Sequence, residues 1–331
     1  MAAVLTVFAV RAAEGDVIDV DDAPKTNVFS KMATAGVFNK LDLALNVGTT
    51  GLGLELATPV TEWVKLRAGV DWVPPFTVPM SFDIHSYTDG GKINSSNFHK
   101  AQELMTSISG YEIDDAVIMD GTPTMTTFKF LVDVYPFKNN RHWHFTAGFY
   151  AGNRQVGKAR NTIEEMPSLL AIGIYNRLYE YVMETDFVET PLPIPGYGDF
   201  YLDPDLGDKL KEKLTDFGRL GVHMGDYKDG TPYIMEPGKD GLLRAKALVN
   251  AFRPYLGFGY GGAISADKRW NASFDCGAMM WGGSPDVITH DGVNMMTQLV
   301  DVPGKVGRYL EIMRAMKVYP VISFRLAYTF F

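Results

Sequence analysis

Apolar residues alternate with smaller or more polar residues along the last stretch of the sequence. One set is Val318, Pro320, Ile322, Phe324, Leu326, Tyr328 and Phe330, and the other is Tyr319, Val321, Ser323, Arg325, Ala327 and Thr329. Successive side chains of a β-strand point to opposite faces, so this stretch predicts a strand with one wholly apolar face. The final Phe331 is one residue out of phase. An aromatic face of this size suits contact with lipid better than contact with water.

The same alternation recurs in seven earlier segments. Together with Val318–Phe330, the predicted strands are Leu41–Gly48, Leu52–Ala57, Trp63–Val73, Thr126–Pro136, Arg141–Asn153, Arg253–Gly262 and Trp270–Trp281. Most are close to the roughly 9–11 residues with which a tilted strand crosses a bilayer, although the first two are slightly short. The apolar phase switches across Thr49, Thr50 and Gly51, which fits a tight hairpin; one long strand with a bulge is the alternative.

Short and long connections alternate along the chain. The short turns are Pro59–Glu62, Phe137–Asn140 and Ala263–Arg269, and the long connections are residues 74–125, 154–252 and 282–317. Transmembrane barrels have short periplasmic turns and longer extracellular loops, whereas a soluble all-β fold has no reason to alternate them. For residues 40–331 we therefore predict an all-β fold, an antiparallel transmembrane β-barrel of about eight strands with short helices in long extracellular loops. The helix candidates are Asn97–Ile108, Ser168–Glu184, Asp205–Phe217 and Gly307–Met316, and the region Arg154–Phe252 is otherwise predicted to contain no strand.

The composition excludes several other classes of protein. Hydrophobic residues make up 46% of the sequence, and no apolar run reaches the length of about 18 residues that predicts a membrane-spanning helix. A net charge of −8 without a Lys/Arg-rich tract argues against a nucleic-acid partner. The single cysteine, Cys276, excludes an intrachain disulfide and a cysteine-based zinc site, and the alternation places it on the lipid-facing side.

The first residues of the sequence predict export. Ala2 to Val10 is a short apolar run, and Ala12 supplies a small residue at a cleavage position. We interpret residues 1–13 as a truncated signal peptide that lacks its basic start; a disordered apolar tail is the alternative. Residues 14–39, which are acidic at first, are predicted to form a periplasmic N-terminal linker.

Charged residues recur on the predicted inward face of the strands. The predicted lumen charge network consists of Glu55, Lys65, Arg67, Asp71, Lys129, Asp133, Asp275 and Arg325. About eight strands leave an interior only wide enough for side chains to fill, so these charges should pair with one another and close the lumen. An ion path is the alternative interpretation.

The last strand resembles the C-terminal strand of Gram-negative outer-membrane β-barrel proteins, and Leu41–Pro59 with Trp63–Gly69 is similar to small OmpA-type barrels. The resemblance implies a barrel in the bacterial outer membrane without a peptidoglycan-binding domain, with extracellular loops and both termini in the periplasm. It implies contact with outer-membrane lipid, and a structural or surface-binding role in which the extracellular loops meet a protein or glycan partner. It also implies an assembly signal for the barrel-assembly machinery, formed by Phe324, Leu326, Tyr328 and Phe330.

Few residues suggest metal binding or catalysis. His142 and His144 share one face, but no third ligand is identifiable, so no metal site is predicted. His290 with Ser284 or Ser273 leaves open a rim-site lipid- or glycan-modifying hydrolase, although no nucleophile motif surrounds either serine. We therefore predict a barrel with a closed lumen that is not an enzyme and not a general porin, with no catalytic residue and no cofactor.

Overall fold

The computed structural model describes residues 40–88, 92–93, 95–110, 113–184, 186, 189–194, 198–201 and 203–330. The predicted signal peptide and linker, residues 1–39, lie outside the described residues, as does Phe331. None of the helices in the described part of the chain is long and apolar enough to cross a membrane.

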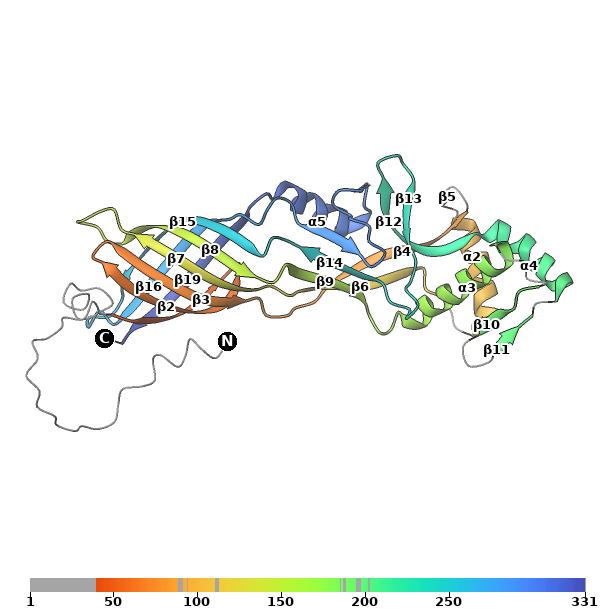
Figure 1. Ribbon diagram of the computed structural model, residues 1–331, viewed down its shortest axis with the longest axis horizontal. Helices are drawn as coiled ribbons and strands as arrows, with labels where there is room; N and C mark the ends of the chain where they lie inside the picture. The colour runs from red at the N-terminus through yellow and green to blue at the C-terminus, as the bar shows by residue number, and fades with distance from the viewer. Residues whose placement is uncertain are drawn as a thin grey trace, which may run out of the picture.

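Eight antiparallel strands form a closed barrel (Figure 1). Their order around the barrel is β1 (Asp42–Gly48), β19 (Tyr319–Thr329), β16 (Trp270–Met279), β15 (Phe252–Ala263), β8 (Trp143–Gly152), β7 (Thr126–Val134), β3 (Val64–Trp72) and β2 (Gly51–Thr61). The first strand closes the barrel by pairing with the last, from Asp42 opposite Thr329 to Gly48 opposite Ser323. The predicted antiparallel barrel is confirmed, and the phase switch at Thr49 and Thr50 is a hairpin turn between β1 and β2.

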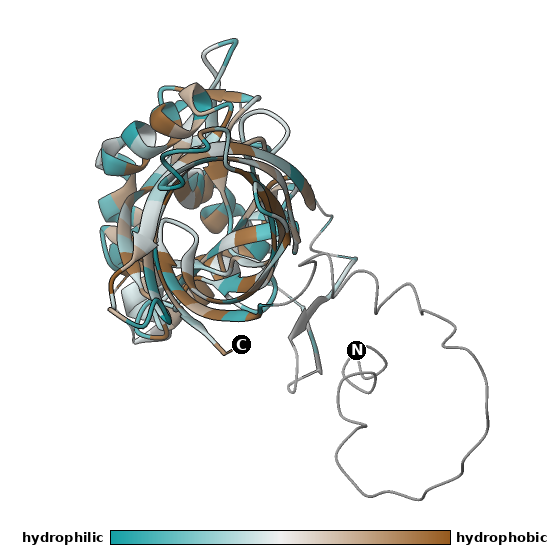
Figure 2. Cartoon of the chain, turned by 90° about the vertical axis from the view of Figure 1, so that its left-hand side faces the viewer, coloured by the Kyte–Doolittle hydropathy of each residue, from teal (hydrophilic) through white to brown (hydrophobic). Residues whose placement is uncertain are grey.

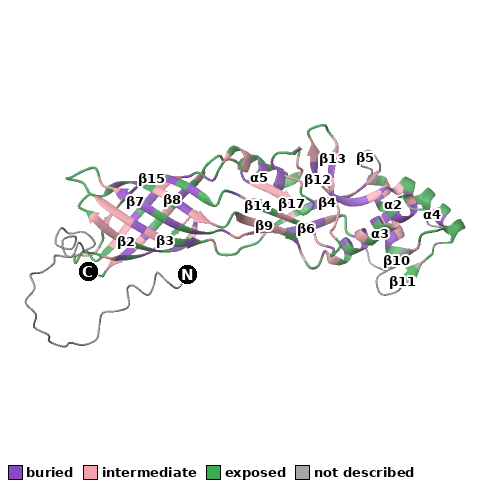
Figure 3. Cartoon of the chain, in the orientation of Figure 1, coloured by how far each residue is buried: buried purple, intermediate pink, exposed green. Residues whose placement is uncertain are grey.

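The barrel strands alternate buried and exposed residues, as a closed wall requires. Along β7, Thr127, Lys129 and Asp133 are buried, whereas Phe128 and Phe130 on the other face are 45% and 37% exposed. Figure 3 shows the same alternation of buried and exposed residues on the neighbouring strands, and Figure 2 looks into the barrel along its axis. The inner wall therefore carries the charged residues of the strands, and the outer wall carries the large apolar ones.

The three long connections fold together into an outer domain built on a second sheet. This nine-stranded sheet has the order β13 (Pro232–Met235), β12 (Arg219–Tyr227), β4 (Val78–Thr88), β6 (Ala116–Pro123), β9 (Gln155–Asn161), β14 (Arg244–Leu248) and β17 (Asp286–Thr289). Two short strands extend it, because β5 (Lys92–Ile93) pairs with β4 and β18 (Leu299–Val300) pairs with β12.

The prediction that Arg154–Phe252 contains no strand outside its helices is therefore wrong. Strand β12 escaped detection because both of its faces carry buried residues, so no alternation is visible in its sequence. Strands β9 and β14 carry Gly or Ala on one face and cationic residues on the other, which removes the apolar pattern that marks a strand. A small separate pair, β10 (Leu192–Ile194) and β11 (Gly198–Phe200), also lies in this region.

The second sheet continues the wall of the barrel. Its strands β4, β6, β9, β14 and β17 lie in the same order as the barrel strands β3, β7, β8, β15 and β16, to which they are joined by between two and six residues. In Figure 1 these strands run on from the barrel along the long axis of the molecule. Five of the eight barrel strands thus extend past the rim as an open sheet, which needs a cover of its own.

Four helices and β12 supply that cover. The helices are α2 (Ser95–Ser109), α3 (Met166–Glu184), α4 (Pro204–Phe217) and α5 (Gly304–Ala315), so each predicted helix is present. One continuous core joins Phe82 and Met119 of the sheet to Ile172 and Tyr175 of α3 and Leu214 of α4. The outer domain therefore has its own hydrophobic core, separate from the interior of the barrel.

Candidate functional site

Arg67 lies at the centre of an ion-pair network that fills the barrel lumen. Its side chain is 3% exposed, and its guanidinium nitrogens lie 2.9 Å from Asp133 Oδ1, 3.2 Å from Asp275 Oδ1 and 3.7 Å from Glu55 Oε1. Thr146 accepts a hydrogen bond from Arg67 and donates one of 2.8 Å to Asp133. Because these residues come from five strands, one planar guanidinium ties opposite parts of the wall together.

A second cluster surrounds Lys129. Its Nζ lies 3.0 Å from Asp71 Oδ1 and 3.1 Å from Glu55 Oε2. Asn46 and Thr50 each donate a hydrogen bond to the Asp71 carboxylate, at 3.0 Å and 2.9 Å. Glu55 is shared with the Arg67 cluster, so the two clusters form one network.

Arg325 and Lys65 complete the set of predicted lumen charges. Arg325 Nη1 lies 3.0 Å from Glu55 Oε1, and its Nε donates a hydrogen bond of 2.9 Å to Ser273. Lys65 pairs with Asp42. All eight residues of the predicted network lie on the inner wall, and the structure adds uncharged partners, Asn46 and Thr146, that charge pairing alone does not reveal.

An apolar cluster, which we call the apolar plug, lies in the lumen at the end next to the outer domain. Leu131, Tyr150, Tyr255, Met279 and Val321 form one buried cluster. The rings of Tyr150 and Tyr255 meet edge to face, with 5.5 Å between their centroids. The lumen therefore contains ion pairs and, at this end, aromatic and aliphatic side chains. A hollow of about 130 Å³ remains beside His144, Ser273 and Arg325.

The two predicted histidines have separate surroundings. His144 Nε2 lies 2.8 Å from Asp275 Oδ1 inside the barrel, whereas His142 lies at the exposed rim with Nδ1 3.0 Å from the carbonyl of Gly261. Within the described residues, no group of three or more His, Cys, Asp or Glu side chains is placed to hold a metal ion.

The residues of the hydrolase alternative are not brought together. Ser273 lies in the lumen and accepts a hydrogen bond from Arg325, and Ser284 donates a hydrogen bond of 2.8 Å to the carbonyl of Arg314. His290 is exposed in the outer domain, next to β17. Each of the three side chains therefore faces different neighbours.

The four residues of the predicted assembly signal lie on the outer wall of β19 and just beyond it. Phe324 and Phe330 are exposed, and Leu326 and Tyr328 are half-buried between neighbouring side chains. Tyr328 stacks edge to face on Trp270 of β16, with centroids 5.1 Å apart.

The outer domain contains an apolar pocket of about 350 Å³. The pocket lies between the sheet strands β4, β6, β9, β14 and β17 on one side and helix α5 on the other. Methionine is the commonest residue of its lining, with Met80, Met119, Met224, Met295 and Met313 from five separate segments. Methionine side chains are flexible and polarisable, so they adapt to apolar ligands of different shape.

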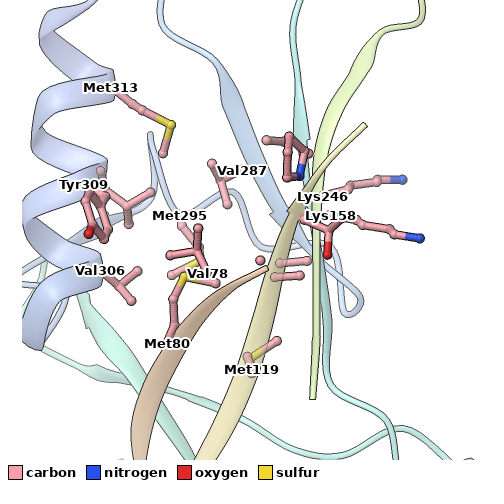
Figure 4. A pocket seen from close by; sticks show the side chains of 18 of the residues that line it. Val78, Met80, Met119, Lys158, Lys246, Val287, Met295, Val306, Tyr309 and Met313 are labelled. Atoms are coloured by element: carbon pink, nitrogen blue, oxygen red, sulfur yellow. The ribbon is translucent and has the colours of Figure 1, made fainter. Parts of the chain in front are cut away.

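Among the described residues along this pocket, the only charged ones are Lys158 and Lys246, and they do not enter it. Figure 4 shows both ammonium groups on the far side of the sheet from α5, while Val78, Met119 and Val306 face the pocket. The pocket therefore offers no charged group of the described chain to a ligand and suits an uncharged, apolar one.

This pocket is not predicted from the sequence, although some of its lining residues follow an alternating pattern. Val78, Met80 and Phe82 alternate with Pro79, Ser81 and Asp83 along β4. In β6, Ile118 separates Val117 from Met119, so no alternation is visible there. Both strands lie in the long connection of residues 74–125, for which the sequence predicts only a helix. Nothing in the sequence indicated that α5, far along the chain, would cover them.

The structure thus defines the class of this protein. It is a closed eight-stranded antiparallel barrel that carries a folded outer domain on five of its strands. The sequence matches no family model and no curated protein.

Among solved structures, the fold is similar to CarO2 of Acinetobacter baumannii, with a TM-score of 0.36 and 15% identity over 88% of this chain and 98% of that chain. For CarO of the same organism the TM-score is 0.36 at 13% identity, with 87% and 97% covered. For a major outer membrane protein from Thermus thermophilus the TM-score is 0.28 at 13% identity, with 88% and 98% covered. These likenesses are distant, so the function proposed below rests on the barrel and its outer domain themselves.

Removing the shared carboxylate should destabilise the barrel. In Glu55→Gln, Arg67, Lys129 and Arg325 each lose a counter-charge in a buried site, which we expect to cost about 3–5 kcal/mol of unfolding free energy. Urea titration of the protein in a lipid bilayer measures this loss. The matched control is Glu62→Gln, which breaks the exposed pair with Arg141 and should cost at most about 1 kcal/mol. Equal losses in the two variants would contradict the network.

Proposed function

We propose that the barrel spans the bacterial outer membrane as a closed anchor, and that its outer domain is a surface-exposed binding module. The observation that carries the proposal is the outer wall, because all eight barrel strands expose apolar side chains. They include Leu43, Leu45, Val47, Leu52, Leu54, Leu56, Val70, Phe128, Phe130, Phe145, Leu256, Phe258, Phe274, Ile322 and Phe324. A belt of this extent is suited to lipid, since soluble monomers rarely expose large contiguous apolar patches.

Aromatic residues border this belt at both ends. Trp63, Trp143 and Trp270 are exposed near the short turns, and Trp72 and Phe252 are exposed near the outer domain. Aromatic girdles of this kind occupy the two membrane interfaces of transmembrane barrels. With the short turns in the periplasm, the outer domain lies outside the cell and both ends of the barrel chain lie in the periplasm.

The filled lumen supports an anchoring role rather than transport. Ion pairs and the apolar plug occupy the space that a permeating ion would need. The proposed partners are outer-membrane lipid, the barrel-assembly machinery during insertion, and a ligand, protein or glycan at the outer domain. The proposed role is non-enzymatic and needs no cofactor.

The methionine-lined pocket supplies a specific binding activity for the outer domain. A volume of about 350 Å³ lies within the range of sites for small organic ligands, which are mostly apolar in lining. We propose that it binds an uncharged apolar molecule or chain.

Placing a charge on the outer wall tests membrane insertion. Phe130→Arg should cost about 2–4 kcal/mol of unfolding free energy in a lipid bilayer, because an arginine near the midplane loses its hydration. Phe137→Arg is the control, since Phe137 is exposed in the turn beyond β7 and its substitution should cost about 0–1 kcal/mol. If the two substitutions had the same effect, β7 would not face lipid.

The closed lumen predicts an absence of ion conduction. Purified protein in planar bilayers should give no stable unitary current, under conditions in which a porin measured in parallel conducts. Large and reproducible unitary currents would show that the ion pairs line an open channel.

Methionine methyl NMR tests the pocket. With ¹³C-methyl methionine in nanodisc-embedded protein, dodecanol should shift the methyl signals of Met119, Met224 and Met295, but not that of Met235, which is buried outside the pocket. Ala247→Phe should fill the pocket and abolish these shifts, and Leu248→Phe, one residue along on the other face of β14, should retain them. Shifts that survive in Ala247→Phe would place the ligand elsewhere.

A further inference from the structure

Two neighbouring strands of the outer sheet place four cationic side chains directly opposite one another. In the pairing of β9 with β14, Arg160 lies opposite Arg244 and Lys158 lies opposite Lys246. All four are exposed, and Figure 4 shows the two lysine ammonium groups together on the side of the sheet that faces away from α5. We call these four residues the cationic quartet.

The quartet is short of counter-charges within the protein. Arg244 pairs with Asp240, but Lys158, Arg160 and Lys246 have no ion pair among the described residues. Like charges directly opposite in an antiparallel pair are destabilising, so the quartet costs folding energy as it stands. It also occurs in a protein whose net charge is −8, so it is not part of a general excess of cations.

The quartet lines a hollow rather than a flat surface. The hollow has a volume of about 350 Å³, and all four cationic residues border it together with His290 and Thr289. No acidic side chain of the described chain lines it. The carboxylate of Asp120, directly opposite Arg160 on β6, lies on the same face of the sheet. Together with Glu164, Lys158 and Arg160 it lines the neighbouring hollow, and it does not line this one.

We propose that this hollow binds an anion that carries two phosphate groups. The two rows of the quartet, one of arginines and one of lysines, are about 7 Å apart along the strands, so each row can hold one phosphate. Arginine offers a bidentate fork to phosphate oxygens, and lysine offers a point charge. Two phosphate monoesters carry about −3 to −4 near neutral pH, and two phosphodiesters carry about −2. Either charge is opposite in sign to Lys158, Arg160 and Lys246, the three quartet cations that have no ion pair among the described residues.

The position of the quartet leaves two sources for such an anion. Lys246 precedes Phe252, at the edge of the apolar belt, by six residues, so the lysine row lies at most about 20 Å beyond the belt and the arginine row about 7 Å further. A diphosphorylated lipid headgroup and a soluble bisphosphate present the same chemistry there. The site faces away from the methionine-lined pocket, so its ligand is independent of an apolar ligand in that pocket.

The test compares three forms of the full chain. They are the natural sequence, the double variant Lys158→Gln/Lys246→Gln, and the control Lys209→Gln/Lys213→Gln, which removes two exposed lysines of α4 and gives the same net charge. Fructose 1,6-bisphosphate, titrated calorimetrically in a non-ionic detergent, probes the soluble source. Phosphatidylcholine vesicles with and without cardiolipin, whose headgroup carries two phosphates, probe the lipid source through the thermal unfolding midpoint.

We expect at least one probe to bind the natural sequence and the control equally, and to bind the quartet variant at least about tenfold more weakly. Binding should weaken with added salt. Without an anion, the Lys158→Gln/Lys246→Gln variant should unfold at the same or a higher temperature than the natural sequence, because cross-strand repulsion is removed. Such a result would exclude misfolding as the cause of weaker anion binding. Binding of the sugar bisphosphate alone, of cardiolipin alone, or of both supports the site and identifies the source. Binding of neither, or equal binding by the quartet variant, overturns it.

Discussion

Closure of the barrel by β1 and β19 is the constraint on which the rest of the structure depends. A closed wall of eight strands has no free edge, and its interior is only wide enough for side chains. Every inward residue must therefore fill space and satisfy its polar groups within that interior. The network of Glu55, Arg67, Lys129 and Arg325 meets most of this condition by sharing carboxylates between cations from different strands. Arg67 Nε and Asp133 Oδ2 have no hydrogen-bond partner among the described residues.

The outer domain arises where the same wall stops being closed. Five strands continue past the rim in unchanged order, while β1, β2 and β19 do not, so the extension is an open sheet with two faces. One face is covered by α5, β12 and the helices of the outer domain, and it holds the apolar pocket. The opposite face is uncovered and carries the cationic quartet. Two sites of opposite chemistry thus share one sheet, because successive residues of a strand face opposite ways.

In the proposed function, this arrangement separates anchoring from binding. The barrel contributes an apolar exterior and a filled interior, and neither needs to change when a ligand meets the outer domain. The short joins between the barrel strands and the strands of the second sheet keep that domain directly on the rim. A closed barrel is a rigid base of this kind because its hydrogen bonds form a complete ring.

The sequence by itself determined the barrel strands, the phase switch at Thr49 and Thr50, the four helices and the inward position of the charged residues. The structure decided that the switch is a hairpin rather than a bulge. The alternation of apolar and polar residues is a local property of the sequence, so it predicts a strand wherever the two faces of that strand have different surroundings. Only the tertiary structure decided the second sheet, the apolar pocket and the cationic quartet. Strand β12 is buried on both faces and shows no period, and Lys158 meets Lys246 only through a pairing between distant segments. Such pairings depend on the energy of the whole fold rather than on any local pattern, which is why the sequence did not reveal them.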